Sequence, residues 1–239
     1  MRADQILFPT YPATNLFERL IIENSALTTL ESLPNSPPWI AHPGYQLHRA
    51  RVEYGFDQLS QLAKQEPGGR FIFLHLLIPH PPFVFNQHGD PNQPAYPYVL
   101  LDGDAFPGNP AQYIQQYESQ RLYLDQRLTE VLADILENKS REAIIVLQSD
   151  HGPGSQLNWA SADETNLRER FGILLAYRLP KNRQHRSAPI DSPVNLFRSI
   201  LNNSFGINLP YLAERSYYST WKNPLDFELI PQEEIDVIH

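Results

Sequence analysis

Two histidines in this sequence each lie just after an apolar run, with a proline within two residues. The first run, Phe71 to Ile78 (FIFLHLLI), leads into PHPP, which contains His80, and the second, Ala143 to Ser149 (AIIVLQS), leads directly into Asp150 and His151. Short apolar runs of this kind are typical of strands that are covered on both faces. Because ligands of open α/β sheets bind beyond the carboxyl ends of the strands, both histidines lie where a site is expected.

Asp150 and His151 are candidate ligands of one divalent metal ion. Neighbouring residues of a strand point to opposite faces, so the two side chains can share an ion only where the chain turns. The sequence GPG that follows them supplies such a turn, since glycine permits unusual backbone angles and proline ends a strand ladder. A carboxylate oxygen and an imidazole nitrogen suit Zn²⁺ or Mn²⁺. His80 is then a candidate hydrogen-bond donor to an anionic oxygen on that metal.

Each of these residues also has a structural interpretation. Asp-His-Gly is a common tripeptide that also occurs without metal, and its placement near a second histidine-bearing strand end is what favours a site. His75, inside the first apolar run, is expected to be a hydrogen-bonded core residue, whereas His48 and His88 are expected to be solvated. Asp102, in the sequence LDGDAF, resembles a cation-binding loop only weakly, and a turn is expected there.

The elements that would position these residues form an α/β pattern. Helices are predicted over residues 15–33, 46–64, 110–138 and 193–203, and strands over residues 71–78, 143–149 and 171–177. Eight prolines lie from Pro79 to Pro110. Residues 79–109 are predicted to form a long functional loop, and the tail from residue 210 is predicted to be irregular. This order of elements predicts an α/β sandwich with a mostly parallel sheet.

Composition limits the classes of protein that the sequence can represent. The chain has 239 residues, 41% of them hydrophobic, which is sufficient for one large folded domain. Its formal net charge of −8 argues against a nucleic-acid-binding protein, and the absence of cysteine excludes disulfides, thiolate zinc sites and a cysteine nucleophile. The longest apolar stretches are strand-length, far below the roughly 20 residues of a membrane-spanning helix. The N-terminus has no apolar stretch of signal-peptide length.

The order of the motifs resembles a known family. HLLIPHPPF, a helix carrying YLDQRL and then IIVLQSDHGPGS are similar to the later half of the sulfatase-like branch of the alkaline phosphatase superfamily, which includes arylsulfatases, phosphoethanolamine transferases and lipoteichoic acid synthases. Arg170 to Tyr177 resembles the strand after the metal motif, with Phe171 in place of a usual proline. Ser192 to Ile207 resembles a family helix, with Asn195 at an aspartate position. The similarity spans residues 70–207. The chain also resembles bacterial sulfatase-like proteins whose catalytic domain follows membrane helices.

The resemblance implies a fold, a chemistry and a set of roles. The implied fold is a three-layer α/β/α sandwich of alkaline phosphatase type in a single domain, with a helical lead-in over 1–69, a core over 70–207 and a tail over 208–239. The implied activity is metal-dependent hydrolysis or transfer of phosphate or sulfate esters. Asp150 and His151 would bind one divalent ion (Mn²⁺, Zn²⁺ or Ca²⁺), and His80 would contact the substrate anion. An Asp-His pair, rather than Asp-Asn, favours phosphoesters. Complete relatives are membrane-anchored and extracytoplasmic.

The sequence departs from the family upstream of PHPP. The family places its nucleophile and its first metal carboxylate there, after the first strands of the sheet, and no segment before Phe71 reads as a strand that ends in Asp or Glu. We therefore expect the chain to be the carboxyl-terminal part of such an enzyme, with an incomplete sheet and little activity by itself. The alternatives are a non-catalytic α/β binding module and a subunit that complements a separate N-terminal half.

Overall fold

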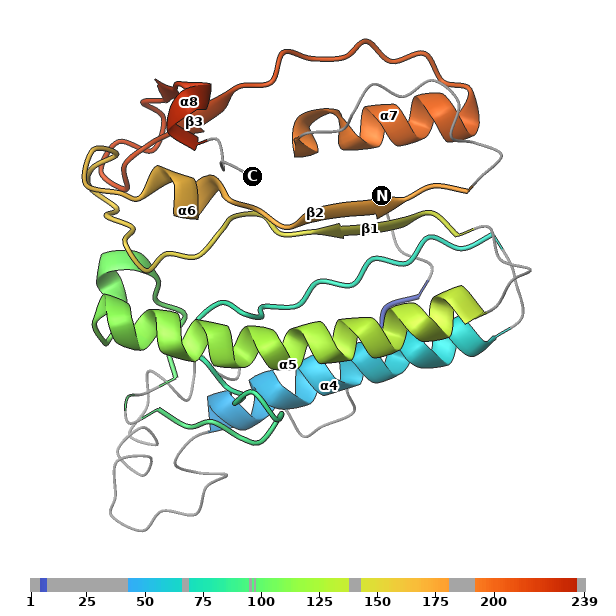
Figure 1. Ribbon diagram of the computed structural model, residues 1–239, viewed down its shortest axis with the longest axis horizontal. Coiled ribbons are helices and arrows are strands. Elements are labelled where there is room, and N and C mark those ends of the chain that lie inside the picture. Colours follow the sequence, from blue (N-terminus) through green and yellow to red (C-terminus); the bar gives the residue numbers. More distant parts are fainter. Residues whose placement is uncertain are drawn as a thin grey trace. The chain divides into compact units, whose positions relative to one another are not determined.

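The computed structural model describes seven stretches of the chain, which form two compact units. The described residues are 5–7, 43–65, 69–94, 96, 98–137, 143–180 and 192–235. The first unit comprises Met1–Leu101 and Gln112–Asn138, and the second comprises Asp102–Ala111 and Lys139–His239. The helix predicted over residues 15–33 lies outside the described residues. Figure 1 shows the helices and strands of the two units as a ribbon.

Two long helices form the framework of the first unit. They are α4 (Pro43–Lys64) and α5 (Pro110–Glu137), which confirms both predicted helices. Proline at the first helical position of α5 is favourable because its missing N–H is not needed there. The helices lie side by side (Figure 1), and Arg127 of α5 forms ion pairs with Asp57 at 3.0 Å and Glu53 at 3.4 Å on α4. Their shared core consists of Tyr45, Val52, Phe56, Ile78, Val84, Phe85, Tyr123 and Val131.

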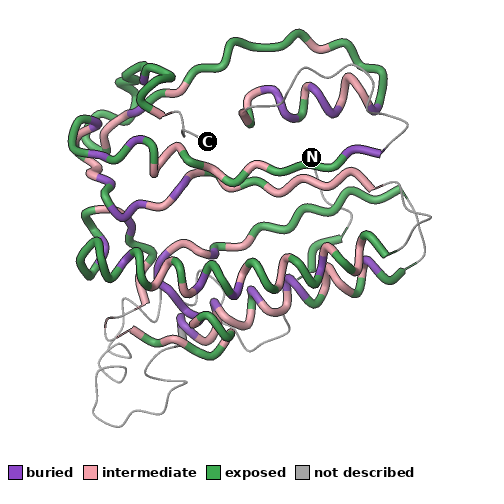
Figure 2. Tube along the Cα trace, viewed as in Figure 1, coloured by how far each residue is buried: buried purple, intermediate pink, exposed green. Residues whose placement is uncertain are grey.

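The apolar run 71–78 is not the buried strand that its sequence predicts. No strand pairs with it in the described part of this unit, and most of its residues are exposed, as the green trace of Figure 2 shows. Phe71 is 76% and Phe73 is 79% exposed, whereas Ile78 is buried. Two of its leucines pack on Gly55 of α4, which covers one side only. A strand requires a hydrogen-bonding partner as well as an apolar sequence, and no described residue of this unit pairs with the run as a strand.

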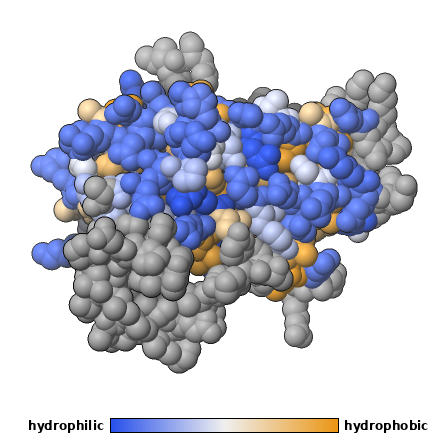
Figure 3. Space-filling view, turned by 90° about the horizontal axis from the view of Figure 1, so that it is seen from below, coloured by the Kyte–Doolittle hydropathy of each residue, from blue (hydrophilic) through white to orange (hydrophobic). Residues whose placement is uncertain are grey.

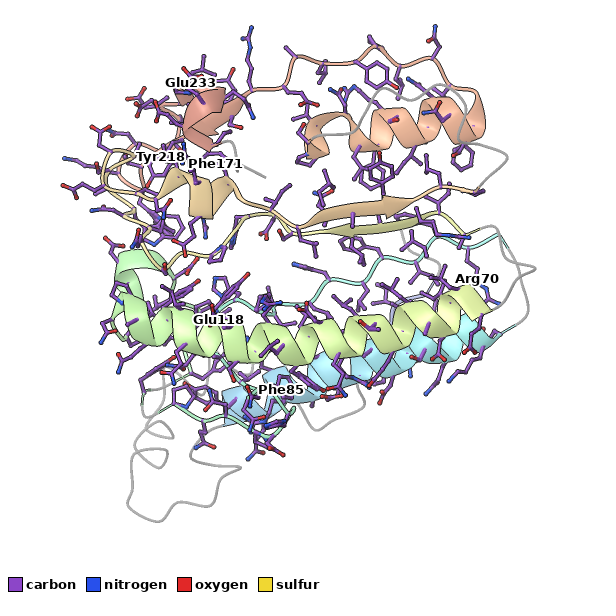
Figure 4. All side chains as sticks on the ribbon, viewed as in Figure 1. Arg70, Phe85, Glu118, Phe171, Tyr218 and Glu233 are labelled. Atoms are coloured by element: carbon purple, nitrogen blue, oxygen red, sulfur yellow. The ribbon has the colours of Figure 1, made fainter. Side chains whose placement is uncertain are left out.

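The proline-rich loop is irregular, as predicted, and is held by side chains. Gln120 of α5 is fully buried, and its side-chain oxygen accepts hydrogen bonds from the backbone N–H groups of Val84 (2.7 Å) and Phe85 (3.1 Å). One isolated bridge joins Phe85 and Pro91. Phe85 belongs to the core beside α4 and α5 (Figure 4). Side-chain acceptors therefore satisfy backbone groups that regular structure would otherwise pair.

A two-stranded ladder and one helix form the centre of the second unit. The strands are β1 (Ile145–Gln148) and β2 (Leu175–Arg178), paired antiparallel with Ile145 opposite Arg178. Helix α7 (Pro193–Phe205) confirms the predicted helix and ends at Gly206, which adopts a left-handed backbone with φ of 67°. The core of this part consists of Leu179, Leu196 and Ile200, against which Ile144, Val146 and Leu175 pack.

The antiparallel direction of this ladder differs from the parallel sheet that was expected. A parallel neighbour requires a crossover that carries the chain back along the sheet, usually a helix of several turns. The connection from β1 to β2 contains only α6 (Leu167–Phe171), five residues long. Phe171, predicted to begin the strand, is the last residue of this helix. Both ladders of the described residues are therefore antiparallel.

The tail contains regular structure that its sequence did not predict. Strands β3 (Ser216–Tyr218) and β4 (Glu228–Ile230) form a second antiparallel ladder, followed by α8 (Gln232–Ile235). Tyr218 and Ile230 are buried in a cluster with Leu157, Ala162 and Leu167, and Phe171 packs against this cluster (Figure 4). Each strand is three residues long, too short for an alternating pattern to be recognised.

The surface of α4 and its surroundings is largely polar. Hydrophilic side chains cover most of the visible described surface in Figure 3, with hydrophobic residues exposed between them. Among the described residues, no helix combines the length and apolar character that crossing a lipid bilayer requires.

Two histidines have the opposite exposure from that predicted. His75 is exposed, since the run that contains it is unpaired. His48 lies on α4 and is only 5% exposed, with the Tyr98 hydroxyl 3.4 Å from its Nδ1 atom. The pKa of His48 is lowered from 6.5 to about 4, mainly by burial. A hydrogen bond with the backbone of Leu77 opposes this shift, and the nearby charges of His80, Arg51 and Arg49 contribute to it.

His48 makes the stability of the first unit depend on pH. Its folded pKa lies below its unfolded pKa, so the unfolded state binds the proton more tightly. The stabilisation is complete above about pH 6.5 and is lost as the pH falls through about 4. We expect the free energy of unfolding to fall by up to about 3 kcal/mol from this residue over that range. Urea unfolding at pH 7 and pH 4.5 should show a smaller difference for His48→Gln than for the unaltered chain.

The matched control is His88→Gln, because His88 is exposed. Its pH dependence should equal that of the unaltered chain. Equal pH dependence in all three proteins would contradict the assignment to His48.

Candidate functional site

Asp150 and His151 lie directly after β1, where the sequence predicts them. Asp150 Oδ2 is 3.6 Å from His151 Nε2, and Asp150 Oδ1 accepts a hydrogen bond of 3.1 Å from the backbone N–H of His151. The chain turns here, as predicted, so that both side chains reach the same side. The side chain of Asp150 is 83% exposed and that of His151 is 31% exposed, which leaves the pair accessible to solvent.

The ring of His151 is oriented by the backbone of the next residue. His151 Nδ1 lies 2.9 Å from the carbonyl oxygen of Gly152. A carbonyl only accepts, so Nδ1 carries the proton and Nε2 carries the lone pair in the neutral ring. Metal-bound histidines typically have their second nitrogen held in this way.

The pair fits a metal ion by its chemistry and its spacing. Two ligand atoms that are each about 2.1 Å from a tetrahedral zinc ion lie roughly 3.4 Å apart. The observed 3.6 Å between Asp150 Oδ2 and His151 Nε2 is close to this value. The donor set, one carboxylate oxygen and one imidazole nitrogen, suits Zn²⁺ and Mn²⁺.

Glycine is required at two positions of the loop because other groups approach closely. A Cβ atom on Gly152 would lie 1.9 Å from the carbonyl oxygen of Glu169. A Cβ atom on Gly154 would lie 2.5 Å from Asp102 Oδ1. The backbone N–H of Gly152 donates to the carbonyl of Arg170 at 2.7 Å. The loop therefore packs directly on α6 and on the Asp102 carboxylate.

Asp102 is the acidic residue of the site that sequence reasoning missed. It precedes η1 (Gly103–Ala105), so the predicted turn is present, but its side chain is buried rather than solvated. Its carboxylate offers a ligand atom within 4.8 Å of a ring nitrogen of His151. No sequence signal joins LDGDAF to its partner, which lies 68 residues further along the chain.

Arg170, at the end of α6, is the partner of Asp102. Its Nη1 atom lies 2.8 Å from Asp102 Oδ2 and 3.2 Å from the carbonyl oxygen of Gly152. The guanidinium lies over the ring of Trp159, with 5.5 Å between its carbon and the ring centroid. Trp159 Nε1 donates to the backbone carbonyl of Asp102 at 2.9 Å. These contacts enclose the ion pair on several sides.

Glu169 closes the other side of the loop. Its carboxylate accepts hydrogen bonds from the hydroxyl of Ser155 at 2.5 Å and from the backbone N–H groups of Ser155 at 3.3 Å and Gln156 at 3.2 Å. The backbone N–H of Glu169 donates to the side chain of Asn166, which caps α6. The Ser155 hydroxyl is thus used to hold the loop.

His80 lies in the first unit, after the unpaired run 71–78. It is half-buried, and its Nδ1 atom contacts the carbonyl oxygen of Pro81. Because that carbonyl only accepts, Nδ1 carries a proton, and the ring can donate from Nε2 only in its doubly protonated form. Of the three residues predicted for the site, the second unit brings Asp150 and His151 together, and His80 belongs to the first unit.

Comparison with known families identifies the chain. A carboxylate and an imidazole together at a strand end of an α/β protein are typical of ester-cleaving metalloenzymes. The sequence model of the sulfatase family matches residues 10–206. The chain therefore belongs to the sulfatase family, whose members have an α/β fold, act on sulfate esters and usually bind a divalent metal ion. No curated protein and no solved structure gave a significant match.

The close approach at Gly152 predicts a large effect of a small substitution. In Gly152→Ala, the added methyl group would overlap the backbone of α6, which cannot move without breaking the contact from Gly152 N to Arg170 O. We expect a loss of about 3 kcal/mol in the free energy of unfolding. Denaturant unfolding measures it.

Gly69→Ala is the matched control, since a Cβ atom there would have no neighbour within 4 Å. It should leave the unfolding midpoint almost unchanged. An equally small effect for Gly152→Ala would contradict the packing of this loop on α6.

Proposed function

We propose that the chain provides a divalent-metal site for the hydrolysis or transfer of phosphate or sulfate esters, with Asp150 and His151 as metal ligands. The observation that carries the proposal is the 3.6 Å separation of Asp150 Oδ2 and His151 Nε2, together with the proton of His151 Nδ1 directed to Gly152. The ring thereby presents its lone pair beside an exposed carboxylate. The family match supports the ester chemistry.

The metal ion, its two ligands and Glu169 would each have a different role in the proposed site. A bound metal supplies charge neutralisation at the ester oxygens and lowers the pKa of a coordinated nucleophile. Asp150 supplies a negative ligand at the solvent-exposed side, and His151 supplies a neutral ligand of fixed orientation. Glu169 keeps the loop after this pair in one conformation through three hydrogen bonds to Ser155 and Gln156.

We propose that His80 contacts the anionic group of the substrate. In its doubly protonated form it would donate from Nε2 while Nδ1 remains on the Pro81 carbonyl. A cation that donates a hydrogen bond to an oxyanion is a usual component of such sites. The family match runs from residue 10 to residue 206 and so includes residues of both units. It supports the proposal that His80 and the metal ligands belong to one sulfatase-like domain.

A second candidate function is that of a subunit that complements a separate N-terminal half. The observation that favours it is the apolar run 71–78, which pairs with no strand among the described residues of its unit and exposes phenylalanines at positions 71 and 73. Such a segment is suited to accept a neighbouring strand, and pairing would make it part of the expected α/β/α sandwich. Co-purification and restored turnover would support this role, and failure to associate would contradict it.

Metal binding tests the ligand assignment. We expect the unaltered chain to bind one Zn²⁺ or Mn²⁺ ion, as measured by isothermal titration calorimetry and elemental analysis. His151→Ala and Asp150→Ala should each lose more than the roughly 10–100-fold in affinity that supporting residues cost, because each removes a ligand. Asp163→Ala is the control, since Asp163 is an exposed carboxylate of the same unit. Unchanged affinity in His151→Ala would refute the site.

Anion binding tests the role of His80. We expect inorganic sulfate or phosphate to bind the metal-loaded chain, and His80→Ala to weaken that binding without changing metal affinity. In any form of the protein that turns over, the same substitution should slow the reaction by about ten- to a thousandfold. Equal loss of metal in His80→Ala would mean that His80 is a ligand and not an anion contact.

Turnover by the isolated chain is the third test. The Ser155 hydroxyl donates to Glu169, and we assign no nucleophile among the described residues. We therefore expect the isolated chain to bind metal but to hydrolyse sulfate and phosphate esters slowly or not at all. Full turnover that is lost in His151→Ala would contradict this expectation while supporting the metal site.

A further inference from the structure

We propose that the buried ion pair of Asp102 and Arg170 positions His151, by fixing which nitrogen of its ring carries the proton. This inference rests on the proposed metal site and concerns how the chain prepares that site before any metal binds. Arg170 contacts neither ring nitrogen of His151. It acts through the carbonyl oxygen of Gly152, which the side chains of Arg170 and His151 both contact.

The first step is that the guanidinium of Arg170 has one well-defined position. The side chain of Asp102 is 4% exposed and that of Arg170 is 14% exposed, with 2.8 Å between Asp102 Oδ2 and Arg170 Nη1. Removing either partner would leave a buried charge uncompensated, which is strongly unfavourable. Trp159 lies against the guanidinium and also donates to the backbone of Asp102, so the pair cannot easily rotate apart.

The second step is that Arg170 contacts both peptide groups that flank Gly152. Its side-chain Nη1 lies 3.2 Å from the Gly152 carbonyl oxygen, and its own backbone carbonyl accepts from the Gly152 N–H at 2.7 Å. The absence of a side chain at Gly152 permits this approach, since a Cβ atom would overlap Glu169. The direction of the Gly152 carbonyl is therefore set by Arg170.

The third step is that this carbonyl sets the tautomer of His151. A carbonyl oxygen has two lone pairs, so it accepts from Arg170 and from His151 Nδ1 together. Arg170 acts here by holding the direction of the carbonyl oxygen, so that one of its lone pairs stays aimed at His151 Nδ1. The ring is then held with its proton on Nδ1 and its lone pair on Nε2, the atom that lies 3.6 Å from Asp150 Oδ2.

The substitutions Arg170→Ala, Arg170→Lys and Asp102→Asn separate this role from a merely structural one. Arg170→Ala removes the charged donor. Arg170→Lys keeps the positive charge but replaces the planar guanidinium by a compact ammonium group. The lysine should therefore contact the Asp102 carboxylate and the Gly152 carbonyl at the same time less well than arginine does. Asp102→Asn keeps the shape of the side chain and removes the negative charge that fixes Arg170. The control is Arg168→Ala, because Arg168 is an exposed arginine of the same helix that contacts the carbonyl of Glu233.

The test is the tautomer of the His151 ring in the metal-free protein, measured by long-range ¹H–¹⁵N NMR correlations at pH 8, where an ordinary imidazole is neutral. The ring signals are assigned by their loss in His151→Gln. We expect the Nδ1–H tautomer in the unaltered chain and in Arg168→Ala, a mixture in Arg170→Ala, and an intermediate result in Arg170→Lys. The affinity for Zn²⁺ should fall by about 10–100-fold in Arg170→Ala, the usual cost of losing a residue that orients a ligand.

An unchanged tautomer and unchanged Zn²⁺ affinity in Arg170→Ala would overturn the proposal. If Arg170→Ala does not fold, as judged by circular dichroism, Asp102→Asn and Arg170→Lys decide the question by the same two measurements. If the unaltered chain binds no Zn²⁺, the metal site fails, whereas the tautomer still tests the action of Arg170 on His151. If Zn²⁺ binds and only the tautomer is insensitive to Arg170, the metal site stands and this inference fails.

Discussion

A buried carboxylate must be neutralised, and in the second unit Arg170 neutralises Asp102. The pair joins the end of the proline-rich loop to the end of α6, two segments separated by 68 positions in the sequence. Because Arg170 also contacts the backbone N–H and the carbonyl oxygen of Gly152, the ion pair fixes the loop that carries Asp150 and His151. The position of the candidate metal ligands thus depends on a charge interaction that neither ligand makes.

In the first unit, side-chain contacts order a long loop that has no regular secondary structure. Its two helices provide a continuous apolar core, and the buried side chain of Gln120 accepts from two backbone N–H groups of the loop. His80 emerges from this ordered segment, directly after the run 71–78. The exposed apolar side chains of that run are unusual for a folded protein and mark a surface that is suited to a neighbouring strand.

The sequence predicted what depends on local pattern and missed what depends on distant partners. Helical periodicity and an initial proline identified α4, α5 and α7, and the strand-then-turn pattern located Asp150 and His151 correctly. The burial of Asp102 could not be predicted, because it depends on Arg170, and the exposure of run 71–78 could not either, because an apolar run is a strand only if another strand pairs with it. The antiparallel direction of β1 and β2, whose connection contains only the five-residue helix α6, is a feature that propensity does not encode.

We propose that Asp150 and His151 bind one metal ion at the end of β1. Anomalous diffraction at the zinc absorption edge, from crystals grown with Zn²⁺, tests it most directly because it locates the ion without reference to activity. We expect one strong anomalous peak within about 2.0–2.2 Å of both Asp150 Oδ2 and His151 Nε2. A peak bound to other residues, or a fully ordered loop with no peak beside these two atoms, would contradict it.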